Sequence, residues 1–321
     1  MSTLWQGRID HPEQADTLRW HQMVLPLTPT AAPGVALLGL ASDEGVRRNG
    51  GRPGAAQGPV ALRAALANLP VWHCGPLYDA GDIVCTSGAL ETAQAEYAAR
   101  IAALLDAGHF PLGLGGGHEI AYASYLGLMT HLGNSASRVG MVNFDTHFDL
   151  RKQALASSGT PFLQALDHAA DCGHHVHYMC LGVSPTANTR HLFTTADHRG
   201  VRYLRDEELA PWSLEDARYR LATWLLEVDV VYLSLCLDVL PQAVAPGVSA
   251  PSAHGISLEV LEALLDVVLA TGKTLVADIA ELSPPHDRDA ATARVAARLL
   301  HRIAGATRYP VSHDAANWRA G

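Results

Sequence analysis

The alternation of two kinds of apolar segment constrains the fold of this chain more than any other feature of its sequence. Short runs rich in β-branched residues alternate with longer Ala- and Leu-rich segments of helical period. This alternation predicts a parallel sheet flanked by helices, because parallel strands need crossover connections that are usually helical. The predicted strands are Val35–Leu40, Phe110–Gly115, Val139–Asp145, His177–Val183, Val228–Asp238 and Thr274–Leu282.

The predicted helices lie between these strands, and we find no internal repeat or low-complexity linker. They cover residues 59–69, 89–108, 119–132, 213–227, 257–272 and 289–303. A doubly wound sheet of this size commonly forms one unit, so we expect residues 1–321 to form a single α/β domain with residues 1–30 as an N-terminal extension. In such sheets the active site lies at the carboxyl ends of the strands.

Composition excludes several classes of protein. The chain is 48% hydrophobic and 17% charged, which is typical of a globular protein, and its net charge of -9 argues against a nucleic-acid partner. The N-terminus lacks the apolar region of a secretory signal, and no apolar run approaches the ~20 residues of a membrane helix. Five cysteines without a CxxC pair favour reduced thiols, so we expect a cytoplasmic protein without a membrane partner.

Unusual polar residues stand where four of the predicted strands end. The four segments are GLGGGHE (Gly113 to Glu119), NFDTHFDLR (Asn143 to Arg151), SLCLDVLP (Ser234 to Pro241) and DIAELSPPHD (Asp278 to Asp287). In the second segment Asp145, His147 and Asp149 alternate with other residues, so an extended chain would point all three to one side. His118 follows glycines that allow the backbone to turn tightly and approach a site.

The chemistry of these residues favours a cation. Carboxylates and imidazoles held close together and buried without partners would cost several kcal/mol, and a bound cation removes that cost. A His- and Asp-rich set of mostly oxygen donors suits Mn²⁺, whereas a structural Zn²⁺ site normally includes thiolates. More than four ligands indicate two ions, and two metals ~3.5 to 4 Å apart can activate a shared water as the nucleophile near neutral pH.

Together the four segments resemble the ureohydrolase superfamily, which includes arginases, agmatinases, guanidinobutyrases and formimidoylglutamases. The resemblance implies a three-layer αβα sandwich with a mostly parallel sheet and two Mn²⁺ ions per subunit that hydrolyse a C–N bond in a guanidine or amidine. It implies that Glu281 holds the cationic group of the substrate and that Asp149 carries a proton to the leaving nitrogen. The metal ligands that it implies are His118, Asp145, His147, Asp149 and Asp238. The habit of the family also implies a homo-oligomer.

Within the superfamily the chain looks most like formimidoylglutamase. The segment SSGTPFLQ has Phe162 where arginases and agmatinases carry a histidine, and DEGVRRNGGRPGAAQGP and YMCLGVSPTANT add to the likeness. The small-molecule substrate implied is N-formimidoyl-L-glutamate, which would yield glutamate and formamide in histidine breakdown. Its carboxylates need cationic or neutral donors, and the candidates are Arg48, Asn49, Arg52, Arg151, Ser158 and Asn188.

Cys236 departs from the family pattern, which has a metal-bridging aspartate at this position. Three interpretations stay open: a thiolate ligand that shifts metal preference away from manganese, a non-ligand that leaves the second metal weakly held or absent, or a mark of lost catalysis. The alternative functions are therefore an agmatinase or guanidino-acid hydrolase and, in another class, a catalytically weak ligand-binding or regulatory homologue.

Overall fold

The computed structural model describes residues 4–11, 14–72 and 75–307 and contains a nine-stranded sheet in which every pairing is parallel. The strands are β1 (Val24–Pro26), β2 (Val35–Ala41), β3 (Leu77–Val84), β4 (Phe110–Gly115), β5 (Val139–Phe144), β6 (Val176–Val183), β7 (Arg202–Arg205), β8 (Val230–Cys236) and β9 (Thr274–Ala280). Their order across the sheet is β1-β3-β2-β4-β9-β8-β5-β6-β7.

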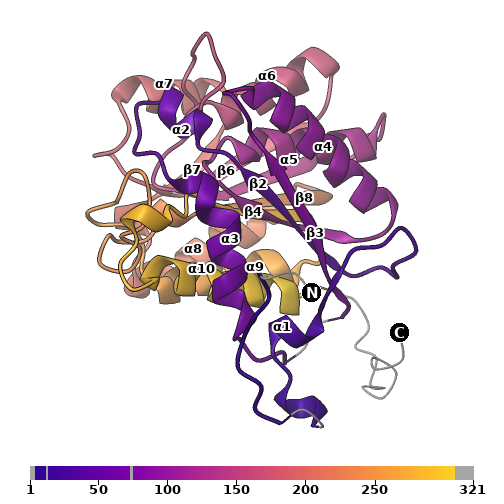
Figure 1. Ribbon diagram of the computed structural model, residues 1–321. Coiled ribbons are helices and arrows are strands. Elements are labelled where there is room, and N and C mark those ends of the chain that lie inside the picture. Colours follow the sequence, from indigo (N-terminus) through magenta and orange to yellow (C-terminus); the bar gives the residue numbers. More distant parts are fainter. Residues whose placement is uncertain (1–3, 12–13, 73–74, 308–321) are drawn as a thin grey trace.

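Helices cover both faces of the sheet, as Figure 1 shows. The helices are α1 (Trp20–Met23), α2 (Glu44–Arg48), α3 (Gly58–Ala67), α4 (Leu90–Asp106), α5 (Ile120–Leu132), α6 (Pro161–Cys172), α7 (Arg190–His198), α8 (Leu214–Leu225), α9 (Leu258–Ala270) and α10 (Ala291–Gly305). One apolar core lies between the sheet and α3, α8, α9 and α10, and a second lies between the sheet and α4 to α7. The predicted three-layer αβα sandwich is confirmed.

Strand β5 shows why the central strands read as continuous apolar runs. All six of its residues are buried. Val142 and Phe144 belong to the first core, and Val139 and Met141 belong to the second. Because side chains alternate between the two faces of a strand, a strand covered on both faces needs apolar residues at almost every position.

Three strands were absent from the sequence prediction. Strands β1 and β7 are short and form the two edges of the sheet. Strand β3 carries Asp79 and Asp82, which break its apolar pattern but bind the fully buried guanidinium of Arg63 at 2.9 and 2.6 Å. Strand β1 also lies within residues 1–30, so part of the predicted N-terminal extension belongs to the sheet.

The sheet order brings the four polar segments together. Strands β4, β9, β8 and β5 are consecutive neighbours, although they come from widely separated parts of the chain. In parallel strands the carboxyl ends meet at one edge, so the segments that follow these four strands form one continuous site. No helix in the described ranges is long and apolar enough to cross a membrane.

Candidate metal centre

The segment after β5 presents its acidic and imidazole groups by bending, so the condition of an extended chain is not met. Strand β5 ends at Phe144, the Asp145 carboxylate accepts a hydrogen bond from the His147 N–H at 2.7 Å, and Asp149 has a left-handed φ of 50°. Asn188 braces this segment, because it accepts from the Phe148 N–H at 3.1 Å and donates to the Thr146 carbonyl at 2.9 Å. Side chain–backbone hydrogen bonds, rather than strand periodicity, therefore set the direction of these groups.

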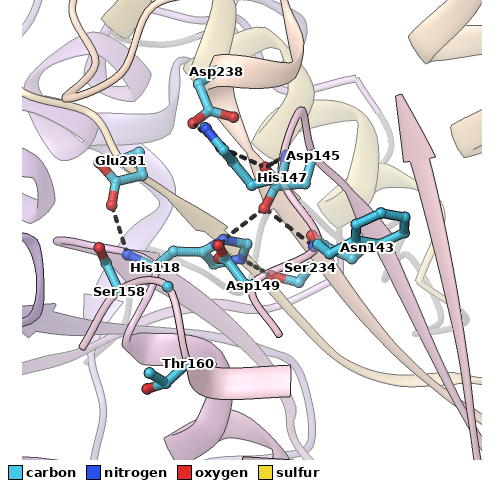
Figure 2. A network of polar contacts seen from close by, with 12 residues as sticks. His118, Asn143, Asp145, His147, Asp149, Ser158, Thr160, Ser234, Asp238 and Glu281 are labelled. Carbon is cyan, nitrogen blue, oxygen red and sulfur yellow. Dashed lines mark hydrogen bonds and ion pairs between the residues drawn. The ribbon is translucent and has the colours of Figure 1, made fainter. Parts of the chain in front are cut away.

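Two imidazoles meet the carboxylates in two overlapping groups, which Figure 2 shows. His118 Nδ1 lies 2.9 Å from both Asp145 Oδ2 and Asp149 Oδ2. His147 Nδ1 lies 3.1 Å from Asp238 Oδ2 and 3.4 Å from Asp145 Oδ1. Asp145 therefore joins the two groups.

The contacts of His118 fit metal ligation better than a simple ion pair. Its Nδ1 is close to two carboxylate oxygens yet makes no hydrogen bond of acceptable geometry with any group in the described part of the chain, and Asp238 Oδ1 is likewise buried without a partner there. These atoms point toward shared spaces rather than directly at one another. Such convergence of imidazole nitrogen and carboxylate oxygen is the donor set of divalent cations of the Mn²⁺ class.

The electrostatics of the site also call for a cation. Burial and the neighbouring Asp145 raise the pKa of Asp149 to about 6 and raise that of Asp238. Burial alone would raise the pKa of Asp145 as well, but the close imidazoles of His118 and His147 hold it below its ordinary value. A carboxyl group resists ionisation where negative charge is already concentrated, and a divalent cation would remove that resistance.

Cys236 lies in this site. It is the last residue of β8 and only 1% exposed, and its Sγ and ligand atoms of His118 and Asp145 all lie within 4.8 Å of one another. Asp145, His147 and Asp238 form a second such group. Asp238 follows in a short 3-10 turn, Leu237–Val239, so the expectation that it continues strand β8 is wrong, although it still reaches the site.

A buried hydrogen-bond network holds His118 from behind, and sequence reasoning missed it. His118 Nε2 lies 2.9 Å from Ser234 Oγ, which donates to Asp278 Oδ1 at 2.6 Å. Tyr232 and Ser124 donate to the other oxygen of Asp278 at 2.7 and 2.6 Å. Such an outer carboxylate orients a ligating imidazole and fixes its tautomer. The available signal was the spacing of Tyr232, Ser234 and Cys236, which puts all three on one face of β8.

Glu281 sits at the opposite wall with one oxygen unused. Its Oε1 accepts the backbone N–H of His118 at 2.9 Å, whereas Oε2 is buried without a hydrogen-bond partner among the described residues. The pKa of Glu281 is raised to about 8, mainly by burial. Ser249 acts in the opposite direction, and the charges of Glu119 and Asp238 raise the pKa further. Gly116 passes so close to Ser42 that a Cβ on it would lie 1.8 Å from the Ser42 carbonyl oxygen, and a glycine allows this approach.

The predicted substrate-binding residues divide into two sets. A cavity of about 280 Å³ is lined by the two groups of acids and histidines, by Cys236 and Glu281, and by Asn49, Arg52, Arg151 and Ser158. Arg48 and Asn188 do not line it. The Arg48 guanidinium instead binds Glu44, Glu91 and the carbonyls of Gly88 and Ala156.

The arginines that line the cavity also differ from each other. Arg52 donates to the backbone carbonyls of Val248 and Ser249 at 2.5 and 3.1 Å, so its guanidinium is partly occupied. Arg151 has no side-chain hydrogen bond or ion pair with any residue that the structure describes. The rings of Phe162 and Tyr178 stack with their centroids 4.5 Å apart, and the rings of Phe162 and His118 meet in a T-shaped arrangement with their centroids 5.5 Å apart. Phe162 therefore forms part of the wall behind the metal groups.

Comparison with known proteins places this site in a family context. Residues 33–305 match the model of the arginase family. A formimidoylglutamase of Aeromonas salmonicida is 50% identical over 305 residues, which cover 94% of this chain and 96% of that protein. A formimidoylglutamase of Chromobacterium violaceum is 48% identical over 299 residues, which cover 92% of this chain and 95% of that protein.

Solved structures show the same architecture. A formimidoylglutamase from Bacillus subtilis superimposes with a TM-score of 0.81 at 22% identity, and the match covers 95% of this chain and 97% of that one. A formiminoglutamase from Trypanosoma cruzi with Mn²⁺ superimposes with a TM-score of 0.76 at 25% identity, with 87% and 95% of the two chains covered.

Proposed function

Because this chain belongs to the arginase family, we propose that it is a formimidoylglutamase, which hydrolyses N-formimidoyl-L-glutamate to L-glutamate and formamide. The observation that carries the proposal is the composition of one cavity. Two overlapping donor groups lie in it together with the Glu281 oxygen and the Arg151 guanidinium that have no partner among the residues the structure describes. These are the groups that an amidine with an attached dicarboxylate would need.

Divalent cations of the Mn²⁺ class fit the two donor groups. His118, Asp145, Asp149 and Cys236 would hold one ion, and Asp145, His147 and Asp238 would hold the other. When bound, such a pair activates a water molecule as a nucleophile near neutral pH. The chain itself must orient the substrate, pair with its charge and move its proton.

Glu281 would bind the amidinium of the substrate. An amidinium offers parallel N–H donors on one edge, and a carboxylate accepts two such donors in a charge-assisted pair. The Oε2 atom of Glu281 is available for this contact, and the His118 N–H fixes the orientation of the carboxylate through Oε1. The substrate cation would also lower the raised pKa of Glu281 and favour its ionised form.

Asp149 would carry the proton. A carboxylate next to the activated water can accept its proton and then return it to a leaving group. Asp149 lines the same cavity as Glu281. In this role Asp149 would pass the proton to the nitrogen that leaves as the amino group of glutamate.

The carboxylates of the substrate would bind at the other end of the cavity. Arg151 supplies a guanidinium without a partner in the described ranges, and Asn49, Ser158 and Arg52 supply further donors. The contacts of Arg48 and Asn188 support positioning roles for these two residues instead of direct binding.

The proposal includes a homo-oligomer that works in the cytoplasm. Its support is the habit of the family for the first point and, for the second, the free thiols of Cys85, Cys172, Cys180 and Cys236, which fit a reducing compartment. The remaining cysteine, Cys74, lies outside the described residues.

The decisive experiment measures products. Purified protein supplied with Mn²⁺ should release glutamate and formamide from N-formimidoyl-L-glutamate, and should turn over agmatine and 4-guanidinobutyrate far more slowly. The control is Glu281→Gln, which should keep its fold. Absence of turnover with Mn²⁺ and with other divalent ions would contradict the proposal, and faster turnover of a guanidino substrate would replace it with the guanidino-acid alternative.

A further inference from the structure

Cys236 makes the two donor groups of the centre chemically unlike. The group of His118, Asp145 and Cys236 combines nitrogen, oxygen and sulfur, whereas the group of Asp145, His147 and Asp238 contains only nitrogen and oxygen. All three residues of the first group are buried, whereas His147 in the second is partly exposed. The difference is one of donor atoms and does not depend on the charge of any group.

The register of β8 brings the sulfur of Cys236 close to His118. Ser234 and Cys236 are two residues apart in the strand and share one face. Ser234 holds Nε2 at the back of the ring at 2.9 Å, while Nδ1 faces Asp145 and Asp149 at the front. The same strand therefore orients the imidazole through Ser234 and presents Cys236 Sγ within 4.8 Å of a ligand atom of His118 and of Asp145.

A second buried cysteine shows what a thiol without this role looks like. Cys180 also lies next to the segment after β5, but its thiol donates to the backbone carbonyl of His147 at 3.3 Å. It belongs to neither donor group. The neighbours of Cys236, in contrast, are the side chains of His118, Asp145, Asp238 and Glu281, so a role in apolar packing does not explain it.

Sulfur changes which cation a site prefers. Thiolate donors select zinc and other thiophilic ions, whereas carboxylate-rich sites suit Mn²⁺. With Asp149, which lies 2.9 Å from His118 Nδ1, the His118 group offers one imidazole, one thiolate and two carboxylates. Four such ligands suit a tetrahedral site, which Zn²⁺ and Co²⁺ accept readily. Mn²⁺ gains little from sulfur and is favoured at the group of His147 and Asp238.

We propose that the metal centre is mixed: the His118 half takes a thiophilic divalent ion of the zinc or cobalt class through Cys236, and the His147 half takes Mn²⁺. The inference rests on the proposed metal centre of the hydrolase but not on the identity of its substrate. It explains a cysteine in the His118 group without assuming that the centre is damaged.

The test reads metal binding directly. Protein loaded with Co²⁺ should show a thiolate-to-cobalt charge-transfer band in the near ultraviolet, and Cys236→Ser and Cys236→Asp should both lose it. The matched control is Cys180→Ser, which should keep the band. With Mn²⁺ and Zn²⁺ supplied together, the unmodified chain should retain roughly one ion of each kind, and Cys236→Asp should retain two Mn²⁺ at the expense of Zn²⁺.

Three results would contradict the mixed metal centre. A cobalt complex without the band, a band that survives in Cys236→Asp, or two equivalent Mn²⁺ ions in the unmodified chain would overturn the mixed centre. If Cys236→Ser fails to fold, Cys236→Asp carries the test, because carboxylates already surround that position. Loss of the proposed amidine hydrolysis with the band intact would refute the function and leave the mixed centre standing, and failure to bind any metal would refute both.

Discussion

The backbone N–H of His118 donates to the side-chain Oε1 of Glu281 at 2.9 Å, across 163 residues of sequence. One hydrogen bond thus joins the residue proposed to hold a metal to the residue proposed to hold the substrate. Because Oε1 is engaged in this way, Oε2 is the oxygen that remains for the substrate. The Glu281 carboxylate is therefore held in place against the backbone of His118.

Glu281→Gln separates the charge of this residue from its shape. The amide oxygen can still accept from His118, but the variant cannot form a charge-assisted pair with an amidinium. Breaking one side of a buried charge pair costs about 2 to 4 kcal/mol, so kcat/KM should fall by roughly 30- to 1,000-fold. Metal content, measured on the same preparation, should stay unchanged, and an unchanged kcat/KM would exclude Glu281 from substrate binding.

Ser234→Ala tests the support of His118. The substitution removes the hydroxyl between His118 Nε2 and Asp278 and leaves the imidazole free to rotate. Loss of a hydrogen-bond partner of a metal ligand typically reduces metal affinity by about 10- to 100-fold. Titration of metal-free protein with metal should therefore show weaker binding at the His118 group. Ser124→Ala removes a different donor to Asp278 and should weaken metal binding less. Equal effects of the two variants would mean that Asp278, and not the contact with His118, is what matters.

Arg151→Met tests recognition of the substrate carboxylates. Arg151 lines the cavity and has no competing partner among the described residues, so its loss should raise KM for N-formimidoyl-L-glutamate about 10-fold or more. Stability should change little. Lys152→Met alters the exposed neighbour and should leave KM unchanged. A normal KM in Arg151→Met would assign the carboxylates to Arg52 or Asn49 instead.

Glu119 should make stability depend on pH. Burial is the main reason that its pKa rises from 4.5 to about 7, and its Oε1 accepts from Ser42 and Gly45. The folded chain therefore binds this proton more tightly than the unfolded chain, and the resulting stability is present below about pH 4.5 and lost as pH rises toward 7.

Glu119→Gln should remove that dependence, because an amide can accept the same two hydrogen bonds without ionising. Relative to the unmodified chain it should gain at most about 3 kcal/mol of unfolding free energy between pH 4.5 and pH 8. Urea unfolding of chelator-treated protein at several pH values measures this. Glu96→Gln, at an exposed position of α4, should follow the unmodified chain. Parallel curves for Glu119→Gln and the unmodified chain would show that Glu119 does not titrate in this range.

The local pattern of the sequence predicted the central strands and the helices α3, α4, α5, α8, α9 and α10, and it singled out the acids and histidines that the structure brings together. Apolar periodicity and residue chemistry are properties of short segments, so strands such as β4, β5, β8 and β9 could be recognised individually. The edge strands and β3 escaped recognition because their burial depends on partners elsewhere, as the pairing of Asp79 and Asp82 with Arg63 shows.

The sequence by itself determined which donor atoms stand at or just after the end of each strand, including the sulfur of Cys236. Only the tertiary structure decided that β4, β9, β8 and β5 are neighbours, so that these atoms meet. It also decided that Arg151 faces the cavity while Glu44 and Glu91 bind the equally plausible Arg48. The physical reason is that strand order and ion pairing arise from contacts between distant residues, and no local pattern encodes them.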